Sequence, residues 1–217
     1  MAGQVPLLNF RQLAKKVICV GRNYGEHIKE LNNSLPKNPL LFLKSTNTII
    51  GEEGKIQIPV GCNDLYQEVE LGVIIGKKGS KIKKEDANNF IGGYTVALDM
   101  TANDFLNQAK KEREPWFLAK SFDTSCVVGP FISKNQLKNP HDIELFCKVN
   151  GEIRQKCSTS AMIFDIPTLI SYISQYSTLE VGDLLLTGTP NGISNVVSGD
   201  EIEFGLTNIC KSKVFVA

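Results

Sequence analysis

Two glutamates and an aspartate at the ends of apolar segments are the residues of this chain best suited to bind a cation. Glu68 and Glu70 are two positions apart in a predicted strand, so both side chains project from the same face. A second apolar run, residues 92–98, ends directly before Asp99. Hard divalent cations bind oxygen ligands of this kind. A Glu-x-Glu pair alone is more often a solvated strand face, and it is Asp99 that favours a metal site.

Three carboxylates that share one site need their charges neutralised. Like charges about 4 Å apart repel by roughly 4 kcal/mol per pair at an effective dielectric of about 20. Three such pairs exceed the stability of a typical domain. Either the carboxylates take up protons or a divalent cation balances them. Because no cysteine or histidine accompanies them in sequence, the all-oxygen ligand set favours Mg²⁺, with Mn²⁺ as a substitute, over zinc.

A histidine and a glutamate form the second candidate group. His27 and Glu30 are three residues apart in an expected helical segment, 24–30, and are therefore neighbours on one helical face. A carboxylate beside an imidazole fixes its tautomer and raises its basicity, which suits a general base acting on water. The simpler interpretation is an incidental surface pair. The other histidine, His141, is in the turn-like segment 139–142 and is expected to be solvated.

A lysine and a loop complete the set of candidates. Lys120 lies in the apolar stretch 116–122, where a lysine needs an anionic partner, either a structural or a substrate carboxylate. The segment 184–192 predicts a strand that ends in a Gly/Thr loop. Such a loop offers hydroxyl and amide groups, and it fits a plain turn and an anion site equally well.

Apolar runs separated by Gly, Pro and Asn predict that strands dominate the chain. These strands must position the candidate residues. The expected strands are 16–20, 40–44, 56–59, 68–75, 93–99, 126–131, 143–149, 184–187, 201–204 and 211–216. One helix is expected after a capping box at Thr101–Asp104, ending before Pro115, and another begins at Asp165 with Pro167 in its first turn. Helices and strands do not alternate regularly, and no phosphate loop follows the first strand, which argues against a doubly wound nucleotide fold. The expected fold class is α+β, β-rich, in one domain.

The composition points to an ordinary globular protein. Of the 217 residues, 42% are hydrophobic and 22% charged, and the net charge of +1 provides no electrostatic case for nucleic acid or a membrane surface. No apolar stretch reaches membrane-spanning length, and the first residues show neither a signal peptide nor an Arg-rich transit helix. Six cysteines without a Cys-x-x-Cys pair indicate free thiols in a reducing compartment. We therefore expect a cytoplasmic protein.

Eight stretches of the chain carry a specific resemblance. They are CVGRNYGEHIKE (19–30), PLLFLKSTNTI (39–49), EVELGVIIGKK (68–78), GGYTVALDMTANDF (92–105), PWFLAKSFDTSC (115–126), VNGEIRQ (149–155), MIFDIPTLISYIS (162–174) and LEVGDLLLTGTPNGI (179–193). With them, the chain resembles the fumarylacetoacetate hydrolase family, most closely its small acylpyruvase and oxaloacetate decarboxylase branch. The resemblance implies a mixed β-sandwich roll, generally assembled as a homodimer. It also implies a single catalytic domain, residues 17–217, after a lead-in segment, residues 1–16.

The resemblance implies three groups of site residues. The metal ligands are Glu68, Glu70 and Asp99. The catalytic residues are His27, Glu30 and Lys120. The expected substrate-binding residues are Arg22, Asn23, Tyr24, Lys120 and Thr189.

The chain departs from the family pattern just beyond the aspartate. The family usually has an arginine and a glutamine there, both contacting the bound keto acid, where this chain has Asn103 and Leu106. Losing a charge-assisted hydrogen bond to a substrate carboxylate commonly costs about 1.5–3 kcal/mol. Three interpretations follow: a different substrate, a weakened ancillary activity, or compensation by a residue such as Arg22 or Lys110.

From the resemblance we expect Mg²⁺-dependent cleavage of a C–C bond in a pyruvate-type keto acid, through a pyruvate enolate. In acylpyruvate hydrolysis His27, oriented by Glu30, activates water; in oxaloacetate decarboxylation the same enolate forms by loss of CO₂. Lys120 stabilises the negative charge in both. The alternatives are keto–enol tautomerisation of oxaloacetate, which requires only proton shuttling, and a non-catalytic relative that binds a metal or a keto acid.

Overall fold

Long apolar runs form the central sheet of the protein. The computed structural model describes residues 7–26 and 36–217 of the chain. Seven strands form this sheet in the spatial order β2 (Leu40–Lys44), β1 (Val17–Gly21), β12 (Leu184–Leu186), β6 (Val69–Ile75), β7 (Ile91–Asp99), β9 (Cys126–Val128) and β3 (Ile49–Ile50). Every residue of β6 is buried. Strands covered on both faces require this kind of continuous apolar sequence.

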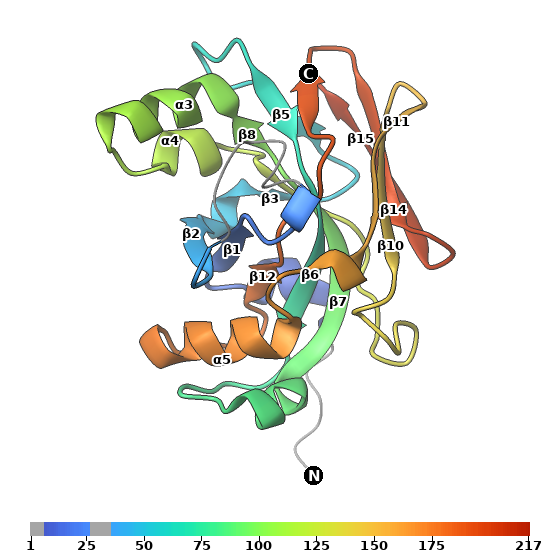
Figure 1. Ribbon diagram of the computed structural model, residues 1–217. Coiled ribbons are helices and arrows are strands. Elements are labelled where there is room, and N and C mark those ends of the chain that lie inside the picture. The colour runs from blue at the N-terminus through green and yellow to red at the C-terminus, as the bar shows by residue number, and fades with distance from the viewer. Residues whose placement is uncertain (1–6, 27–35) are drawn as a thin grey trace.

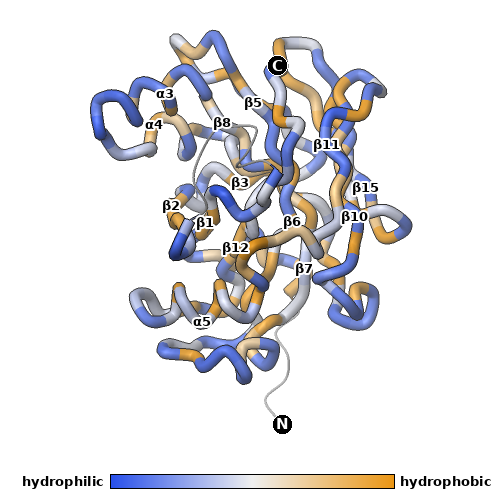
Figure 2. Tube along the Cα trace, viewed as in Figure 1, coloured by the Kyte–Doolittle hydropathy of each residue, from blue (hydrophilic) through white to orange (hydrophobic). Residues whose placement is uncertain are grey.

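A second sheet covers one face of the first. It has the order β11 (Glu152–Ser158), β10 (Glu144–Val149), β14 (Glu201–Leu206), β15 (Cys210–Val216) and β4 (Lys55–Ile56). Burial alternates along β10 and β15, because one face packs on the core and the other faces solvent. β10 and β14 pack on β6 and β7, with the apolar positions between the sheets (Figures 1 and 2).

A small third sheet lies at the end of β6 and β7. Its order is β13 (Ser194–Val196), β5 (Leu65–Gln67) and β8 (Thr101–Ala102). β5 directly precedes β6, and β8 directly follows β7, so this sheet fixes the chain on both sides of the candidate carboxylates. The expected β-rich α+β fold is confirmed.

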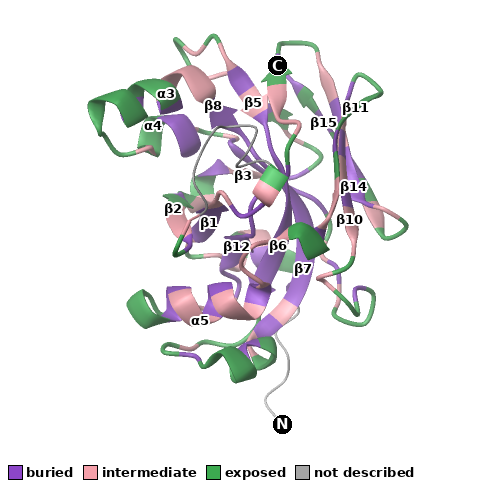
Figure 3. Cartoon of the chain, in the orientation of Figure 1, coloured by how far each residue is buried: buried purple, intermediate pink, exposed green. Residues whose placement is uncertain are grey.

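Four α-helices in the described ranges lie outside the sheets (Figure 1). They are α1 (Phe10–Leu13), α3 (Asn103–Glu112), α4 (Phe117–Lys120) and α5 (Ile166–Tyr176). The start of α5 is as expected: Asp165 caps it by accepting a hydrogen bond from Thr168 N at 2.8 Å, and Pro167 is in the first turn. Figure 3 shows that α3 is exposed on its outer side, whereas β6, β7 and β8 are buried. None of the described helices combines the length and apolar character needed to cross a membrane.

Nine of the ten expected strands overlap a strand of three or more residues in the structure, and the tenth, 56–59, overlaps only the end of β4. The sequence interpretation missed β11 and the short strands of the third sheet, whose polar residues give little alternation. The division into a lead-in segment and a single domain stays a prediction. Leu7 and Phe10 of that lead-in segment are buried against Val17 and Ile74.

The expected capping box before α3 is wrong. Thr101 belongs to β8, where it pairs with Tyr66, so its backbone is still extended. The helix begins two residues later, its N-cap residue is Ala102, and no side chain caps it. The Thr101 hydroxyl instead donates a hydrogen bond to Glu68 Oε1 at 2.7 Å. The threonine that the pattern assigned to the helix therefore serves the carboxylate site.

The expectation that His141 is solvated is also wrong. The ring is half-buried, and its Nε2 accepts a hydrogen bond from Ile166 N at 3.1 Å. The first amides of a helix lack partners within the helix, and the imidazole satisfies one of them. Burial lowers the pKa of His141, and the nearby Lys84 lowers it further, whereas Asp165 has the opposite effect.

Candidate active site

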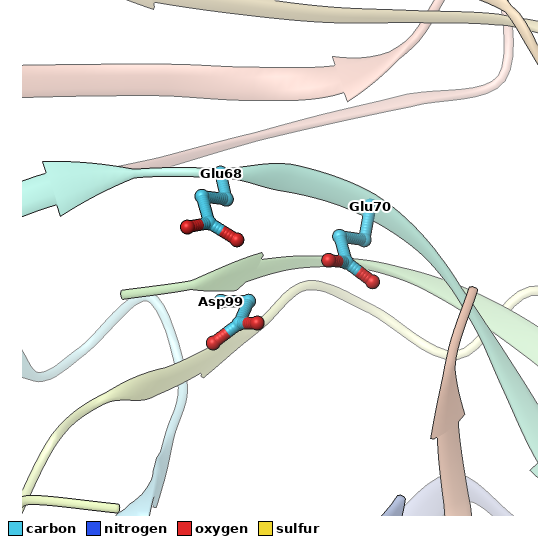
Figure 4. Close-up of side chains that lie close together, drawn as sticks. All are labelled: Glu68, Glu70 and Asp99. Carbon is cyan, nitrogen blue, oxygen red and sulfur yellow. The ribbon is translucent and has the colours of Figure 1, made fainter. Parts of the chain in front are cut away.

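Two adjacent strands bring the three predicted carboxylates together. β6 and β7 are antiparallel with Glu70 opposite Ala97, and Asp99 N donates a hydrogen bond to Glu68 O at 2.9 Å. One oxygen from each of Glu68, Glu70 and Asp99 lies within 4.8 Å of the other two. Figure 4 shows the three side chains close together, Glu68 from the position directly before β6, Glu70 from β6 and Asp99 from the end of β7. Their exposed fractions are 9%, 1% and 0%.

Two buried lysines balance this cluster. Lys120 Nζ lies 2.9 Å from Glu68 Oε2 and 2.9 Å from Asp99 Oδ2. Lys44 Nζ lies 2.7 Å from Asp99 Oδ1 and donates hydrogen bonds to the carbonyl oxygens of Met100, at 3.0 Å, and Lys120. From the sequence we expected protons or a divalent cation to balance the charge, whereas the structure also places two lysines beside the carboxylates. Three carboxylates and two ammonium groups leave one net negative charge when all five are ionised.

The pKa values follow from burial and from these neighbours. Burial raises the pKa of Glu70 well above its usual range, and the charges of Asp99 and Glu68 raise it further. Burial acts in the same direction on Asp99, but Lys120 and Lys44 outweigh it, so its pKa is lowered. For Lys120, burial favours the neutral amine, yet Asp99 and Glu68 outweigh burial and raise its pKa. This direction favours the ammonium form of Lys120.

Hydrogen bonds hold Glu68 and Glu70 in place. Thr101 donates to Glu68 Oε1, and Gly188 N donates to Glu70 Oε2 at 2.6 Å. Gly188 has a φ of +101°, a conformation that favours glycine. A Cβ at this position would lie 2.7 Å from the Cβ of Asn23. A residue without a side chain therefore provides the amide that binds Glu70.

The donor set fits a divalent cation. All three candidate ligands offer carboxylate oxygens, and the cluster has one net negative charge beside its two lysines when all five groups are ionised. Asp99 Oδ1 is buried and accepts no hydrogen bond of good geometry from the described residues, although Lys44 is within ion-pair distance. Hard cations such as Mg²⁺ and Mn²⁺ prefer such oxygens.

A pocket opens directly onto the carboxylates. Polar and apolar side chains from several elements surround it. The lining residues are Val20, Gly21, Arg22, Leu40, Phe42, Glu68, Glu70, Asp99, Asn103, Leu106, Lys110, Trp116, Lys120, Thr189 and Ile193. The pocket thus has an inner end formed by the carboxylates and Lys120, and a wall that includes residues of α3.

The predicted substrate-binding residues divide into two groups. Arg22, Lys120 and Thr189 line the pocket, whereas Asn23 and Tyr24 are buried behind it. The Asn23 amide donates to the carbonyl oxygens of Phe164 and Thr187, and its carbonyl accepts from Phe164 N. This side chain joins separate segments of the chain, and its part in substrate binding stays a prediction. His27 and Glu30 lie outside the described residues.

Lys44 and Gln155 are site residues that the sequence interpretation missed. Lys44 ends the otherwise apolar strand β2. A lysine in an apolar stretch is the same signal that identified Lys120. Gln155 Nε2 donates to Thr189 Oγ1 at 2.8 Å, while its Oε1 accepts from Val69 N at 2.9 Å. Gln155 thereby orients the Gly/Thr loop against β6. No local pattern indicates this role, because Gln155 is in the strand that was not predicted.

Comparisons with known proteins identify the family of the chain. The family described as fumarylacetoacetate (FAA) hydrolase C-terminal matches residues 16–216. The chain belongs to the fumarylacetoacetate hydrolase family. The expected resemblance is therefore confirmed, as is the expectation of an enzyme of this family.

Curated relatives and solved structures cover nearly the whole chain. It is 59% identical to "Oxaloacetate tautomerase fahd-1, mitochondrial" from Caenorhabditis elegans, over 95% of this chain and 97% of that protein. It is 46% identical to "Oxaloacetate decarboxylase, mitochondrial" from Dictyostelium discoideum, over 92% of both. The crystal structure of fumarylpyruvate hydrolase from Pseudomonas aeruginosa with Mn²⁺ and pyruvate matches with a TM-score of 0.90 and 30% identity, covering 94% of this chain and 90% of that one.

The expected cytoplasmic location is wrong, because the names of these curated relatives place them in mitochondria. All six cysteines are free, as expected. Free thiols indicate a reducing environment and do not identify which compartment provides it.

Proposed function

We propose that this protein catalyses the keto–enol tautomerisation of oxaloacetate with the aid of Mg²⁺ or Mn²⁺. The observation that carries the proposal is a buried carboxylate triad, paired with Lys120, at the inner end of a pocket. The name of the Caenorhabditis elegans relative, at 59% identity, favours tautomerisation over the C–C bond cleavage that the sequence interpretation put first.

Glu68, Glu70 and Asp99 hold the cation in this proposal. When bound, a divalent cation would supply the positive charge that attracts an anionic keto acid and stabilises its enolate. It changes the net charge of the cluster from one negative to one positive, which suits an anionic keto acid.

Lys120 provides a fixed positive charge for the enolate. Its ammonium group lies in the pocket, 2.9 Å from both Glu68 Oε2 and Asp99 Oδ2. Negative charge develops on the substrate oxygen as the C3–H bond breaks, and a preorganised cation stabilises that charge selectively.

The proton itself needs a different residue. In this proposal His27, oriented by Glu30, removes the proton from C3 and returns it to the C2 oxygen, which converts the keto form into the enol. The C3–H bond breaks, an O–H bond forms, and no C–C bond breaks. This role is proposed from the spacing of the two residues and from the family resemblance.

The test follows the decay of enol oxaloacetate by ultraviolet absorbance with Mg²⁺ present, against Mg²⁺ in buffer alone. We expect wild type to accelerate the decay and His27→Ala to lose most of this acceleration, by about 10²-fold or more. The chain has two histidines, so His141→Gln is the matched control and should retain activity. Wild-type rates equal to the buffer rate, or full activity of His27→Ala, would exclude this mechanism.

Cleavage of a C–C bond is the second candidate function. The names of the Dictyostelium discoideum decarboxylase and the Pseudomonas aeruginosa fumarylpyruvate hydrolase favour it, and both reactions form a pyruvate enolate that the same site can stabilise. A coupled assay for pyruvate, with oxaloacetate and acetylpyruvate as substrates, measures this activity separately. Pyruvate formation faster than tautomerisation would reverse the order of the two candidates.

A homodimer remains part of the proposal on the basis of the family resemblance. Size-exclusion chromatography with light scattering tests it, since a dimer has twice the 23.9 kDa of the chain. A monomer at micromolar concentration would contradict it.

A further inference from the structure

One face of α3 forms a wall of the pocket. Asn103, Leu106 and Lys110 all line the pocket, and their spacing of i, i+3 and i+7 places them on one helical face. Side chains on a helix point back toward its N-terminus. Lys110 therefore extends over the turn that carries Leu106. The helix lies beside α4 at one side of the molecule (Figure 1).

The first two residues on this face, Asn103 and Leu106, have no positive charge with which to bind a carboxylate. The Asn103 side-chain amide donates to Asp64 Oδ2 at 2.7 Å, and its backbone N–H donates to Asp64 O at 2.8 Å. Leu106 is apolar and only 8% exposed. Any cation that this wall offers to a substrate must come from the next position, Lys110.

Lys110 is held beside an aromatic ring. Its Nζ lies 5.9 Å from the centroid of the Trp116 ring, which in turn packs against Phe42 at 5.7 Å. Within the described ranges, no carboxylate lies within 4 Å of Lys110 Nζ. Lys110 as a whole is an exposed residue, yet its side chain lines the pocket, as do Trp116 and Phe42.

Positive charge accumulates on this side of the pocket. The surrounding protein removes part of the hydration of Lys110 and lowers its pKa, and the charges of Lys120 and Arg22 lower it further. Arg22 also lines the pocket, from the end of β1, with a left-handed φ of +59°. An anionic group between these cations would relieve their mutual repulsion.

We propose that Lys110 binds the second carboxylate of a dicarboxylic keto acid and so makes the enzyme prefer dicarboxylates to monocarboxylates. The inference rests on the proposed function for the orientation of the substrate, whose 2-keto acid end faces the carboxylate triad. The far carboxylate then points toward the α3 wall. Lys110 supplies the charge that the family usually provides from the position of Asn103.

A matched pair of ligands isolates this role. Oxaloacetate and 2-oxobutyrate have the same four-carbon skeleton, and the latter has a methyl group in place of the second carboxylate. Trp116 is the only tryptophan of the chain and lies in the pocket, so its fluorescence reports binding to the Mn²⁺-loaded protein. We expect wild type to bind oxaloacetate about tenfold or more tightly than 2-oxobutyrate.

Lys110→Met keeps the aliphatic stem on Trp116 and removes the charge. It is expected to weaken oxaloacetate binding about tenfold and to leave 2-oxobutyrate binding unchanged, whereas Lys110→Arg keeps the selectivity. In turnover, KM for oxaloacetate rises about tenfold while kcat stays within about twofold. Lys111→Met, one position along on the same helix and outside the pocket, is the control. It should leave the affinity for both ligands unchanged.

The double variant Asn103→Arg with Lys110→Met provides the reciprocal test. An arginine at the usual family position should restore dicarboxylate selectivity. Equal binding of the two ligands by wild type, or an equal loss for both in Lys110→Met, would overturn the inference. Selective binding without any turnover would leave Lys110 in its role and would instead contradict the proposed function.

Discussion

The inner end of the pocket and its α3 wall differ in how firmly the fold determines them. At the inner end, Glu70 and Asp99 belong to central strands, and Lys44 and Lys120 reach them from β2 and α4. Every one of these side chains is buried. The α3 wall is a single helix whose outer face is exposed (Figure 3).

Because of this difference, substrate specificity can change at the α3 wall without a change in the chemistry of the inner end. Replacing a buried charge at the inner end leaves another buried charge unpaired, which costs several kcal/mol. On the α3 wall the exposed Lys110 can be replaced at little cost to stability, although Leu106 is buried and Asn103 is hydrogen-bonded to Asp64. The departure from the family pattern at Asn103 and Leu106 lies on this wall, while the triad at the inner end is unchanged.

The largest effect is expected for Asp99→Asn. The change removes a candidate ligand and takes a carboxylate away from both Lys44 and Lys120, so the free energy of unfolding should fall by about 3 kcal/mol. Mn²⁺ affinity should fall at least about 100-fold, measured by calorimetry. Asp86→Asn, at an exposed acid, is the control. A variant that binds Mn²⁺ as wild type does would show that the triad is not the metal site.

The two buried lysines should separate catalysis from stability. Lys120→Met removes a cation from the pocket, so kcat should fall by about 10²-fold. Lys44 contacts Asp99 but does not line the pocket, so Lys44→Met should lower kcat by only about tenfold while lowering stability by about 2–3 kcal/mol. Steady-state kinetics and urea denaturation measure the two quantities. Equal losses of kcat would mean that both lysines act on the substrate.

Two glycines with positive φ allow a smaller, controlled test of the inner end. Gly188→Ala should lower the free energy of unfolding by about 2–4 kcal/mol, because the new Cβ would be 2.7 Å from the Asn23 Cβ. Gly199→Ala has a similar φ of +95° but meets nothing within 4 Å, so about 1 kcal/mol is expected. Urea denaturation compares the two. Equal losses would mean that the loop can shift away from Asn23.

The smallest effect is expected on the α3 wall. Asn103→Arg with Leu106→Gln restores the usual family residues, and KM for oxaloacetate should change by less than about tenfold because Lys110 already supplies the charge. Stability should fall by about 1–2 kcal/mol, because Leu106 is buried and Asn103→Arg removes the side-chain hydrogen bond to Asp64. A large gain of activity in kinetic assays would instead mark the natural site as impaired.

The fold was predictable where the sequence pattern has one meaning. The apolar runs of β6 and β7 and the capped start of α5 were recognised because burial on both faces, or a cap with proline, leaves few alternatives. β11 was missed because four of its seven residues are exposed and polar or charged side chains dominate it. Thr101 was assigned to a helix because a capping pattern is local, whereas its pairing with Tyr66 depends on a strand thirty-five positions earlier.

The sequence predicted which carboxylates form the site, but not that Lys44 helps to neutralise their charge. The spacing of Glu68 and Glu70 gave a common face, and the resemblance brought Asp99 to them. The part played by Lys44 depends on β2 and α4 meeting at Asp99, which no spacing in the sequence expresses. His141 was misjudged for the same reason, since the helix end that it caps is far along the chain.

The lysines beside the triad have a consequence for the order in which the enzyme is assembled. Two ammonium groups offset two of the three carboxylates, and the raised pKa of Glu70 lets a proton offset the third. The newly made chain can therefore complete its core without the ion, unlike small domains whose folding requires their metal. Protein purified in chelator should keep its native circular dichroism and gain activity when Mg²⁺ is added. On the proposed function, loading with metal is then a late, reversible step.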